Sequence, residues 1–278
     1  MAQTERIEIA AADARLAGRL VRPAGSPLAA AVIHAATGVP ARFYCGFADW
    51  LAETRGVACL TYDYRDFGQS GSARGSRATM ADWGIRDQQA ARATLAAALP
   101  DVPLWVIGHS LGGMMLPFQS ELGRIDRVVT VAAGAVHVTD HPWPARAAIR
   151  AFWSRPVLGL TRALGHLPAA RFGIGHDLPA GVYAQWRLWC TSRGFHAADP
   201  TLPAPDAAAL TCPVRMVAVA DDAYCPPVSV ERLAAAYPAA RMTRVLLRPG
   251  EVGMRRIGHL DVLGARGRAC WDAVTGPA

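Results

Sequence analysis

A serine flanked by small residues is the side chain of this sequence best suited to nucleophilic chemistry. Ser110 lies at the centre of Gly-His-Ser-Leu-Gly, residues 108–112, which fits the pattern G-x-S-x-G. An apolar run at 104–107 precedes the pattern and a helical pattern follows it, so we predict a sharp strand-to-helix turn with the hydroxyl at its tip. Such a turn needs glycines, because its tip is strained and closely packed. Ser110 is therefore the candidate nucleophile; the alternative is a turn serine that caps the next helix.

A nucleophilic serine needs a general base within hydrogen-bond reach and an acid that orients this base. An imidazole suits the first task, because it titrates near neutrality and can take the hydroxyl proton and later return it. The chain contains eight histidines. Two adjacent carboxylates, Asp221 and Asp222, follow a predicted strand at its carboxyl end, where α/β proteins build their sites. The residue types of a Ser-His-Asp triad are thus all present.

Alternating strand and helix patterns must position these residues. An alternating apolar pattern predicts an antiparallel hairpin at the start of the chain, and short apolar runs predict buried strands further on. The hairpin strands are 5–10 and 16–22, and the later strands are 29–34, 57–62, 104–107, 127–133, 214–220 and 242–247. Amphipathic helical patterns occur at 42–54, 80–99, 228–236 and 265–274. This alternation predicts a mostly parallel sheet with helices on both faces.

Four stretches together resemble the α/β-hydrolase superfamily, and in particular its serine hydrolases. The turn at 108–112 resembles the nucleophile elbow, and Tyr-Asp-Tyr-Arg-Asp-Phe-Gly-Gln-Ser at 62–70 resembles the D-x-R-G-x-G-x-S loop. Residues 220–227 resemble the acid loop, and 257–259 the histidine loop. They occur in the superfamily's order over nearly the whole chain, which makes the set far more specific than any one stretch. The resemblance implies the α/β-hydrolase fold, with a structural role for the 62–70 loop.

The resemblance also implies the roles of single residues. His259 lies where the superfamily places its general base, although Leu-Asp-Val follows it in place of a bulky aromatic pair. Asp222 is the expected orienting acid, because similar sequences place this acid four residues before a proline, here Pro226. Asp221 is then expected to accept backbone N–H groups of a loop. The order Ser110, Asp222, His259 is that of the α/β hydrolases.

An acyl-transfer site also needs donors for a developing negative charge. Each N–H group aimed at this oxyanion is worth about 3 kcal/mol. Leu111, the residue after the nucleophile, should donate the first. The second should come from residues 34–38, His-Ala-Ala-Thr-Gly, which stand where the superfamily usually has His-Gly. We expect Ala36 to be this donor and Thr37 the reserve; the alternative is a plain strand-to-helix turn.

Residues 138–205 interrupt the regular alternation of strands and helices. They are rich in Pro, Gly, Arg and Trp and show no clear strand pattern. Residues 1–137 and 206–278 would form the hydrolase core. In this superfamily an insertion at this point usually forms a helical lid, and we expect one at 138–205. Trp143 and Trp186 would then border the substrate together with Thr37 and His109. The alternatives are a small core of the lid itself for the tryptophans, and a packed, hydrogen-bonded neighbour of the serine for His109.

Composition restricts the partners of the chain. The formal net charge is +7 and all basic residues are arginines, but they are scattered, so we expect no nucleic acid as a partner. The six cysteines have no metal spacing and no nucleotide-binding motif appears, so we expect no cofactor and no metal. No apolar run is long enough to span a membrane, and no signal-peptide pattern is visible, so we expect a cytoplasmic enzyme. A homodimer is left open.

The sequence therefore predicts a cofactor-independent serine hydrolase that cleaves a small-molecule carboxylic ester through an acyl-enzyme on Ser110. An acyltransferase or thioesterase would use the same triad and differ in the acceptor or the acyl donor. The third possibility is a ligand-binding protein with a hydrolase fold that has lost its catalytic activity. Such a protein would be expected to lack a residue of the triad, and all three candidates are present.

Overall fold

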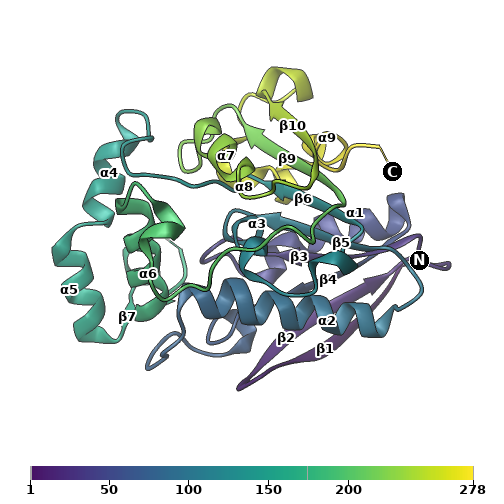
Figure 1. Cartoon of the computed structure of the whole chain (residues 1–278), viewed down its shortest axis with the longest axis horizontal. Helices are drawn as coiled ribbons and strands as arrows, with labels where there is room; N and C mark the ends of the chain where they lie inside the picture. Colours follow the sequence, from purple (N-terminus) through teal and green to yellow (C-terminus); the bar gives the residue numbers. More distant parts are fainter. Residues whose placement is uncertain (1, 174, 278) are drawn as a thin grey trace.

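An eight-stranded sheet runs through the centre of the protein (Figure 1). The computed structural model describes residues 2–173 and 175–277. The strands are β1 (Gln3–Ala11), β2 (Ala14–Arg22), β3 (Ala29–His34), β4 (Val57–Tyr62), β5 (Leu104–His109), β6 (Arg127–Val131), β9 (Pro213–Val219) and β10 (Arg241–Leu247). Their order in the sheet is β1-β2-β4-β3-β5-β6-β9-β10. The β1–β2 and β2–β4 pairs are antiparallel and the other five are parallel, so the predicted mostly parallel sheet is confirmed.

The burial of each strand follows from its position in the sheet. Every residue of β3 and of β4 is buried, as expected for central strands with helices on both faces. The edge strand β1 is exposed over its first four residues. Each large apolar side chain of the central strands that leaves water contributes about 1.5–3 kcal/mol. Burial of these runs therefore fixes which strands lie inside.

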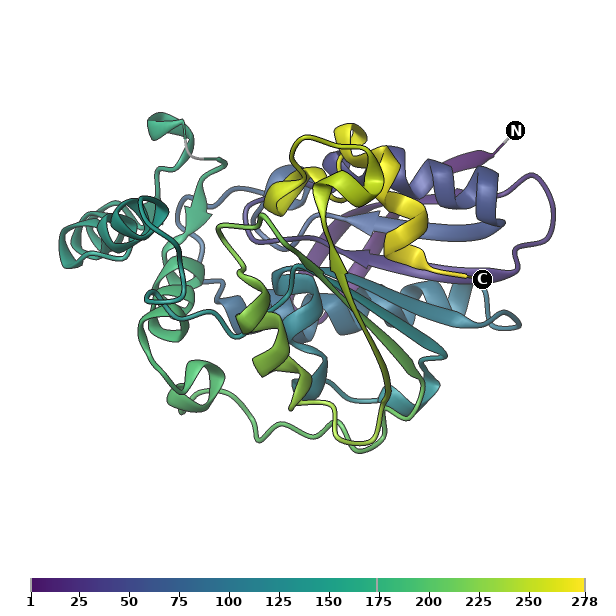
Figure 2. The same cartoon turned by 90° about the horizontal axis from the view of Figure 1, so that it is seen from above.

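Helices cover both faces of the sheet (Figure 2). Helices α1 (Cys45–Arg55) and α9 (Trp271–Thr275) lie on one face, and α2 (Gln88–Ala98) and α7 (Pro227–Ala234) on the other. Phe47 and Trp50 of α1 pack on Trp271 of α9, with ring centroids 5.4 and 5.6 Å apart. Helix α1 ends at Gly56, whose φ of 64° is the left-handed C-cap conformation that glycine adopts most easily.

The predicted helix at 80–99 has two parts. Its first turns form a π-helical segment, η3 (Asp82–Asp87), before α2 continues as a regular helix. Thr79 caps the start: the Asp82 N–H donates to the Thr79 hydroxyl at 3.2 Å, and the Thr79 N–H donates to the Asp82 carboxylate at 2.8 Å. This reciprocal pair is a capping box.

Residues 138–205 form helices at one side of the sheet (Figures 1 and 2). The helices are α4 (Ala145–Phe152), α5 (Arg155–Leu164) and α6 (Ala180–Thr191). An antiparallel pair of two-residue strands, β7 (His166–Leu167) and β8 (Leu178–Pro179), lies between α5 and α6 in the chain. Such short strands have no periodicity by which to predict them. Gln185 of α6 accepts the Ala81 N–H at 2.8 Å, which ties this segment to the core. No helix of the described residues is long and apolar enough to cross a membrane.

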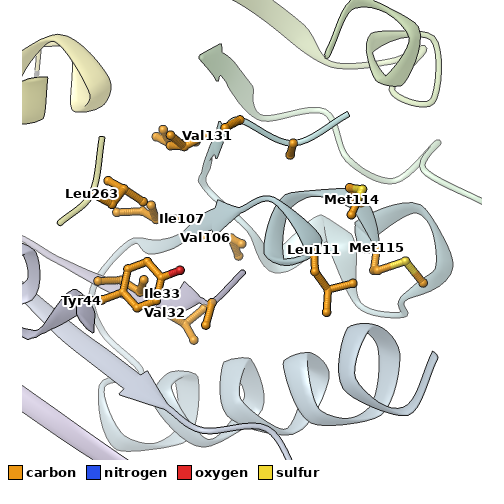
Figure 3. Close-up of a cluster of buried hydrophobic side chains, with 14 of the residues drawn as sticks. Val32, Ile33, Tyr44, Val106, Ile107, Leu111, Met114, Met115, Val131 and Leu263 are labelled. Carbon is orange, nitrogen blue, oxygen red and sulfur yellow. The ribbon is translucent and has the colours of Figure 1, made fainter. Parts of the chain in front are cut away.

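Buried apolar side chains surround the elbow strand β5 and the short helix α3 (Leu111–Met114) that follows it. Figure 3 shows this part of the core, with labelled side chains from β3, β5, β6 and α3 and two from the loops around them. Tyr44, from the 3-10 turn η1 (Ala41–Tyr44), lies in the same cluster and is almost fully buried. A short 3-10 turn, η4 (Leu116–Phe118), follows α3, with Pro117 in its first turn.

Candidate active site

The turn at Ser110 has the strained backbone that the sequence pattern predicts. Ser110 has φ 52° and ψ −115°, a conformation that costs a non-glycine residue about 1–3 kcal/mol. Its N–H donates to the Val131 carbonyl at 2.9 Å, and its own carbonyl accepts the Gly113 N–H at 3.0 Å. The surrounding backbone thus holds the serine at the junction of β5 and α3.

Close approach of neighbouring backbone explains both glycines of the pattern. A Cβ at Gly108 would lie 2.3 Å from the Gly112 carbonyl oxygen. A Cβ at Gly112 would lie 2.1 Å from the carbonyl oxygen of His34 at the end of β3. Both distances are well inside van der Waals contact, so only glycine fits at either side of Ser110 without a backbone shift.

His259 and Asp222 meet beyond the carboxyl end of β9. Nδ1 of His259 lies 2.7 Å from Oδ2 of Asp222, whose side chain is fully buried, while the His259 side chain is 12 % exposed. The other carboxylate oxygen accepts the N–H groups of Tyr224 and Cys225 at 2.8 and 2.9 Å. Because Nδ1 faces a carboxylate, it carries the hydrogen, and Nε2 is the nitrogen left to accept a proton.

Asp221 acts on the backbone of the histidine loop. Its two oxygens accept the N–H groups of Ile257 and Gly258, each at 3.0 Å. Gly258 has φ 66°, a left-handed conformation that a side chain would strain. We expect from the sequence that Asp221 accepts backbone N–H groups, and in the structure its donors lie 36 and 37 residues away, directly before His259.

The elbow and the imidazole are neighbours. The ring of His109, the residue before Ser110, lies 5.0 Å from the ring of His259 between centroids. Among the described residues, the Ser110 hydroxyl makes no hydrogen bond with His259. Catalytic hydrogen bonds are often long in a protein without substrate and shorten in the complex.

The two backbone N–H groups that we expect to face an oxyanion differ in whether they already have a hydrogen-bond partner. The N–H of Leu111 is at the first position of α3, where a helix offers no carbonyl partner of its own. The N–H of Ala36 donates to the Tyr44 hydroxyl at 2.9 Å. This bond uses the hydrogen of Ala36 that we expect from the sequence to face an oxyanion. The hydroxyl of Thr37 contacts the sulfur of Met80 at 3.8 Å.

The other predicted substrate residues lie in different surroundings. His109 is fully buried, and burial lowers the pKa of its imidazole to about 3. His109 is thus a packed, hydrogen-bonded neighbour of the serine, which is the alternative that we give to substrate contact. Trp143 is 79 % exposed. Trp186 packs against Phe152 and Trp153, with centroid distances of 6.0 and 4.9 Å, which is the small core of the 138–205 segment itself.

The 62–70 loop is held by buried carboxylates. Asp63 accepts the N–H groups of Ala41 and Gln69 at 2.7 and 2.8 Å. Arg65 forms a buried ion pair with Asp87 at 2.8 Å, and burial raises the pKa of the Asp87 carboxyl to about 6. These contacts fit the structural role that we expect for this loop.

Tyr44 is a residue of this site that we did not predict from the sequence. Its hydroxyl bonds to both the loop after β3 and the His109 ring, yet it belongs to no motif. Its only signal is a large aromatic residue at the start of the predicted 42–54 helix. Within 2–173 and 175–277, no three His, Cys, Asp or Glu side chains come together in a group that could hold a metal ion.

A model of the alpha/beta hydrolase family matches residues 31–268. This chain belongs to that family. Residues 108–112, 220–227 and 257–259 all lie within the matched range. No curated protein matches the chain.

Solved structures of low sequence identity share the fold of this hydrolase-family chain. A putative hydrolase from Agrobacterium vitis S4 is 15 % identical with a TM-score of 0.61, over 99 % of this chain and 96 % of that one. The esterase domain of a Rhodothermus marinus protein is 18 % identical with a TM-score of 0.59, over 98 % and 95 %. A thermophilic esterase from Thermogutta terrifontis is 17 % identical with a TM-score of 0.54, over 98 % and 97 %.

Proposed function

We propose that this protein is a cofactor-independent serine hydrolase that cleaves a carboxylic ester through an acyl-enzyme on Ser110. The observation that carries the proposal is the hydrogen bond between His259 and a fully buried Asp222, formed next to the strained elbow. An imidazole fixed in this tautomer presents Nε2 as a base, and the elbow presents a hydroxyl. The esterases among the structural neighbours support the same reaction class.

In the first half-reaction, His259 Nε2 takes the Ser110 hydroxyl proton as Oγ attacks the ester carbonyl carbon. The carbonyl electron pair moves onto oxygen, and N–H donors stabilise this oxyanion. We assign the first donor to Leu111. The Ala36 N–H is occupied by Tyr44, so we assign the second to its reserve, Thr37. The tetrahedral intermediate then collapses, and the alcohol leaves with the proton of His259.

In the second half-reaction, a water molecule takes the place of the alcohol. His259 removes one water proton as the oxygen attacks the acyl carbon, and a second tetrahedral intermediate forms. Its collapse breaks the bond to Ser110 Oγ, which recovers its proton from the imidazolium. Asp222 stabilises that imidazolium in both halves through the 2.7 Å bond to Nδ1.

The test is a panel of short-chain aryl esters, thioesters and amides, assayed on wild type and on the Ser110→Ala variant. We expect ester hydrolysis to fall by a factor of about a thousand or more in the variant, as for removal of a triad nucleophile. A fluorophosphonate probe should label Ser110 in the wild type only. Undiminished ester hydrolysis by Ser110→Ala would overturn the proposal.

A second candidate function is acyl transfer or thioester cleavage on the same residues. The observation that favours it is the set of exposed arginines in the 138–205 segment, which would suit an anionic acyl carrier: Arg150, Arg155, Arg162, Arg171 and Arg193. Product analysis with competing alcohols separates acyl transfer from hydrolysis. The thioesters of the panel show whether the acyl donor is an ester or a thioester.

A further inference from the structure

A buried row of three hydrogen bonds crosses the site from the loop after β3 to the histidine loop. The Ala36 N–H lies 2.9 Å from the Tyr44 hydroxyl, and this hydroxyl lies 2.8 Å from Nδ1 of His109. Nε2 of His109 lies 2.9 Å from the carbonyl oxygen of His259. Ala36, Tyr44 and His109 are at most 2 % exposed, so water does not compete for these bonds.

The partners fix the direction of every bond in this row. The His259 carbonyl can only accept, so Nε2 of His109 must carry a hydrogen. Burial keeps the ring neutral by lowering its pKa to about 3, so Nδ1 has no hydrogen and accepts from the Tyr44 hydroxyl. The Tyr44 oxygen then accepts the Ala36 N–H. The bonds therefore all run one way, from Ala36 to His259.

The His259 carbonyl completes a set of restraints on the histidine loop. Asp221 holds the N–H groups of the two preceding residues, and Asp222 holds the imidazole. Neither carboxylate can hold a carbonyl oxygen, which needs a donor. His109 supplies this donor, and it is the residue directly before Ser110. Two adjacent residues therefore carry the proposed nucleophile and the contact to the His259 backbone.

We propose that Tyr44 and His109 are positioning residues, which set the placement of the β3 loop and of His259 relative to Ser110. This inference rests on the proposed function, because it concerns the geometry of the same triad. Without the Tyr44 hydroxyl, Nδ1 of His109 and the Ala36 N–H both lose their partners. A neutral His109 can then exchange its hydrogen between nitrogens, and in the Nδ1–H form Nε2 would face the His259 carbonyl with a lone pair.

The experiment compares Tyr44→Phe with Tyr237→Phe as a matched control. Both tyrosines are buried, and the Tyr237 hydroxyl donates to a backbone carbonyl, that of Gly113, at 3.1 Å. With a short-chain aryl ester, we expect Tyr44→Phe to lower kcat by about tenfold or more at little-changed KM, as for loss of an arrangement needed in the transition state. Tyr237→Phe should keep both parameters near the wild-type values. Equal kcat values for the two variants would overturn the inference.

A spectroscopic readout tests the row without catalysis. Imidazole ¹⁵N NMR of the wild type should show His109 as the neutral Nε2–H tautomer from about pH 5 to pH 8, with no titration in the range of an ordinary histidine. The Nδ1–H tautomer, or titration in this range, would overturn the inference even if Tyr44→Phe fails to fold.

Fluorophosphonate labelling of the same samples separates the two proposals. A wild type that neither labels nor hydrolyses would overturn both, and a Tyr44→Phe variant that labels at the wild-type rate would overturn only this one.

Discussion

The carboxylate of Asp221 accepts the backbone N–H of Gly258 at 3.0 Å, one residue before His259, whose Nδ1 lies 2.7 Å from Asp222 Oδ2. Two adjacent acids in one loop therefore act on the same partner loop in different ways, one through the backbone and one through the ring. This division makes their substitutions distinguishable by experiment.

Replacement of Asp222 by Asn should remove activity while the fold is kept. An asparagine offers its amide N–H₂ or its carbonyl to Nδ1, so it does not stabilise an imidazolium. We expect kcat to fall by about 10⁴-fold with a small change in KM. Steady-state kinetics with an aryl ester and a thermal melt of the same sample measure both effects. Activity above about a tenth of wild type would show that another group orients His259.

Replacement of Asp221 by Asn should affect stability more than chemistry. An asparagine retains one acceptor oxygen, so one of the two N–H groups of Ile257 and Gly258 loses its partner. An unpaired buried donor costs about 1–3 kcal/mol. We expect a lower melting temperature and a smaller loss of kcat than for Asp222→Asn. The opposite ranking of the two kcat values would exchange the roles that we assign to these acids.

A methyl group at Gly112 should disrupt the elbow. The added Cβ would lie 2.1 Å from the His34 carbonyl oxygen, which is backbone and cannot rotate away. We expect Gly112→Ala to lower the free energy of unfolding by about 3 kcal/mol or more, in the range of severe packing defects. Gly25→Ala is the control, because nothing lies within 4 Å of its added Cβ. Urea unfolding of both variants provides the comparison, and equal midpoints would contradict the close packing described here.

Acid should destabilise the protein through His109 and His196, whose folded-state pKa values are lowered. Burial lowers the pKa of His196 to about 3, as it does for His109, from an ordinary value of 6.5. Between these two values the unfolded chain binds more protons than the folded protein. The free energy of unfolding should therefore fall as pH falls from 6.5 towards 3, by up to about 1.4 kcal/mol per pH unit for each such group.

His196→Gln tests this pH dependence away from the triad. Urea unfolding at several pH values below 6.5 should give a shallower slope for the variant than for wild type. His176→Gln is the control, because it makes the same substitution at an exposed histidine. Identical slopes for wild type and His196→Gln would show that His196 is protonated in the folded protein.

The strands of this fold were predictable because burial selects apolar runs. β3 and β4 are buried at every position and match the predicted ranges 29–34 and 57–62 residue for residue. The strained turn at Ser110 was predictable because only small residues fit beside it. In both cases a local requirement of the structure leaves a direct mark on the residue types.

Other features depend on contacts that no local pattern records. The bond from Tyr44 to His109 joins residues 65 positions apart, and nothing near Tyr44 in the sequence marks its hydroxyl as buried. The donors to Asp221 lie in another loop for the same reason. The occupied N–H of Ala36 also appears only when Tyr44 is placed. Three expectations stay predictions: the cytoplasmic location, the lid function of 138–205 and the oligomeric state of the chain.

The aromatic cluster of Phe152, Trp153, Tyr183 and Trp186 gives the 138–205 segment an interior of its own. These rings supply much of the packing of this segment, beside the bonds that tie it to the core, such as that from Ala81 to Gln185. A substitution within this cluster should therefore disturb the helices of the 138–205 segment before it disturbs the β-strands.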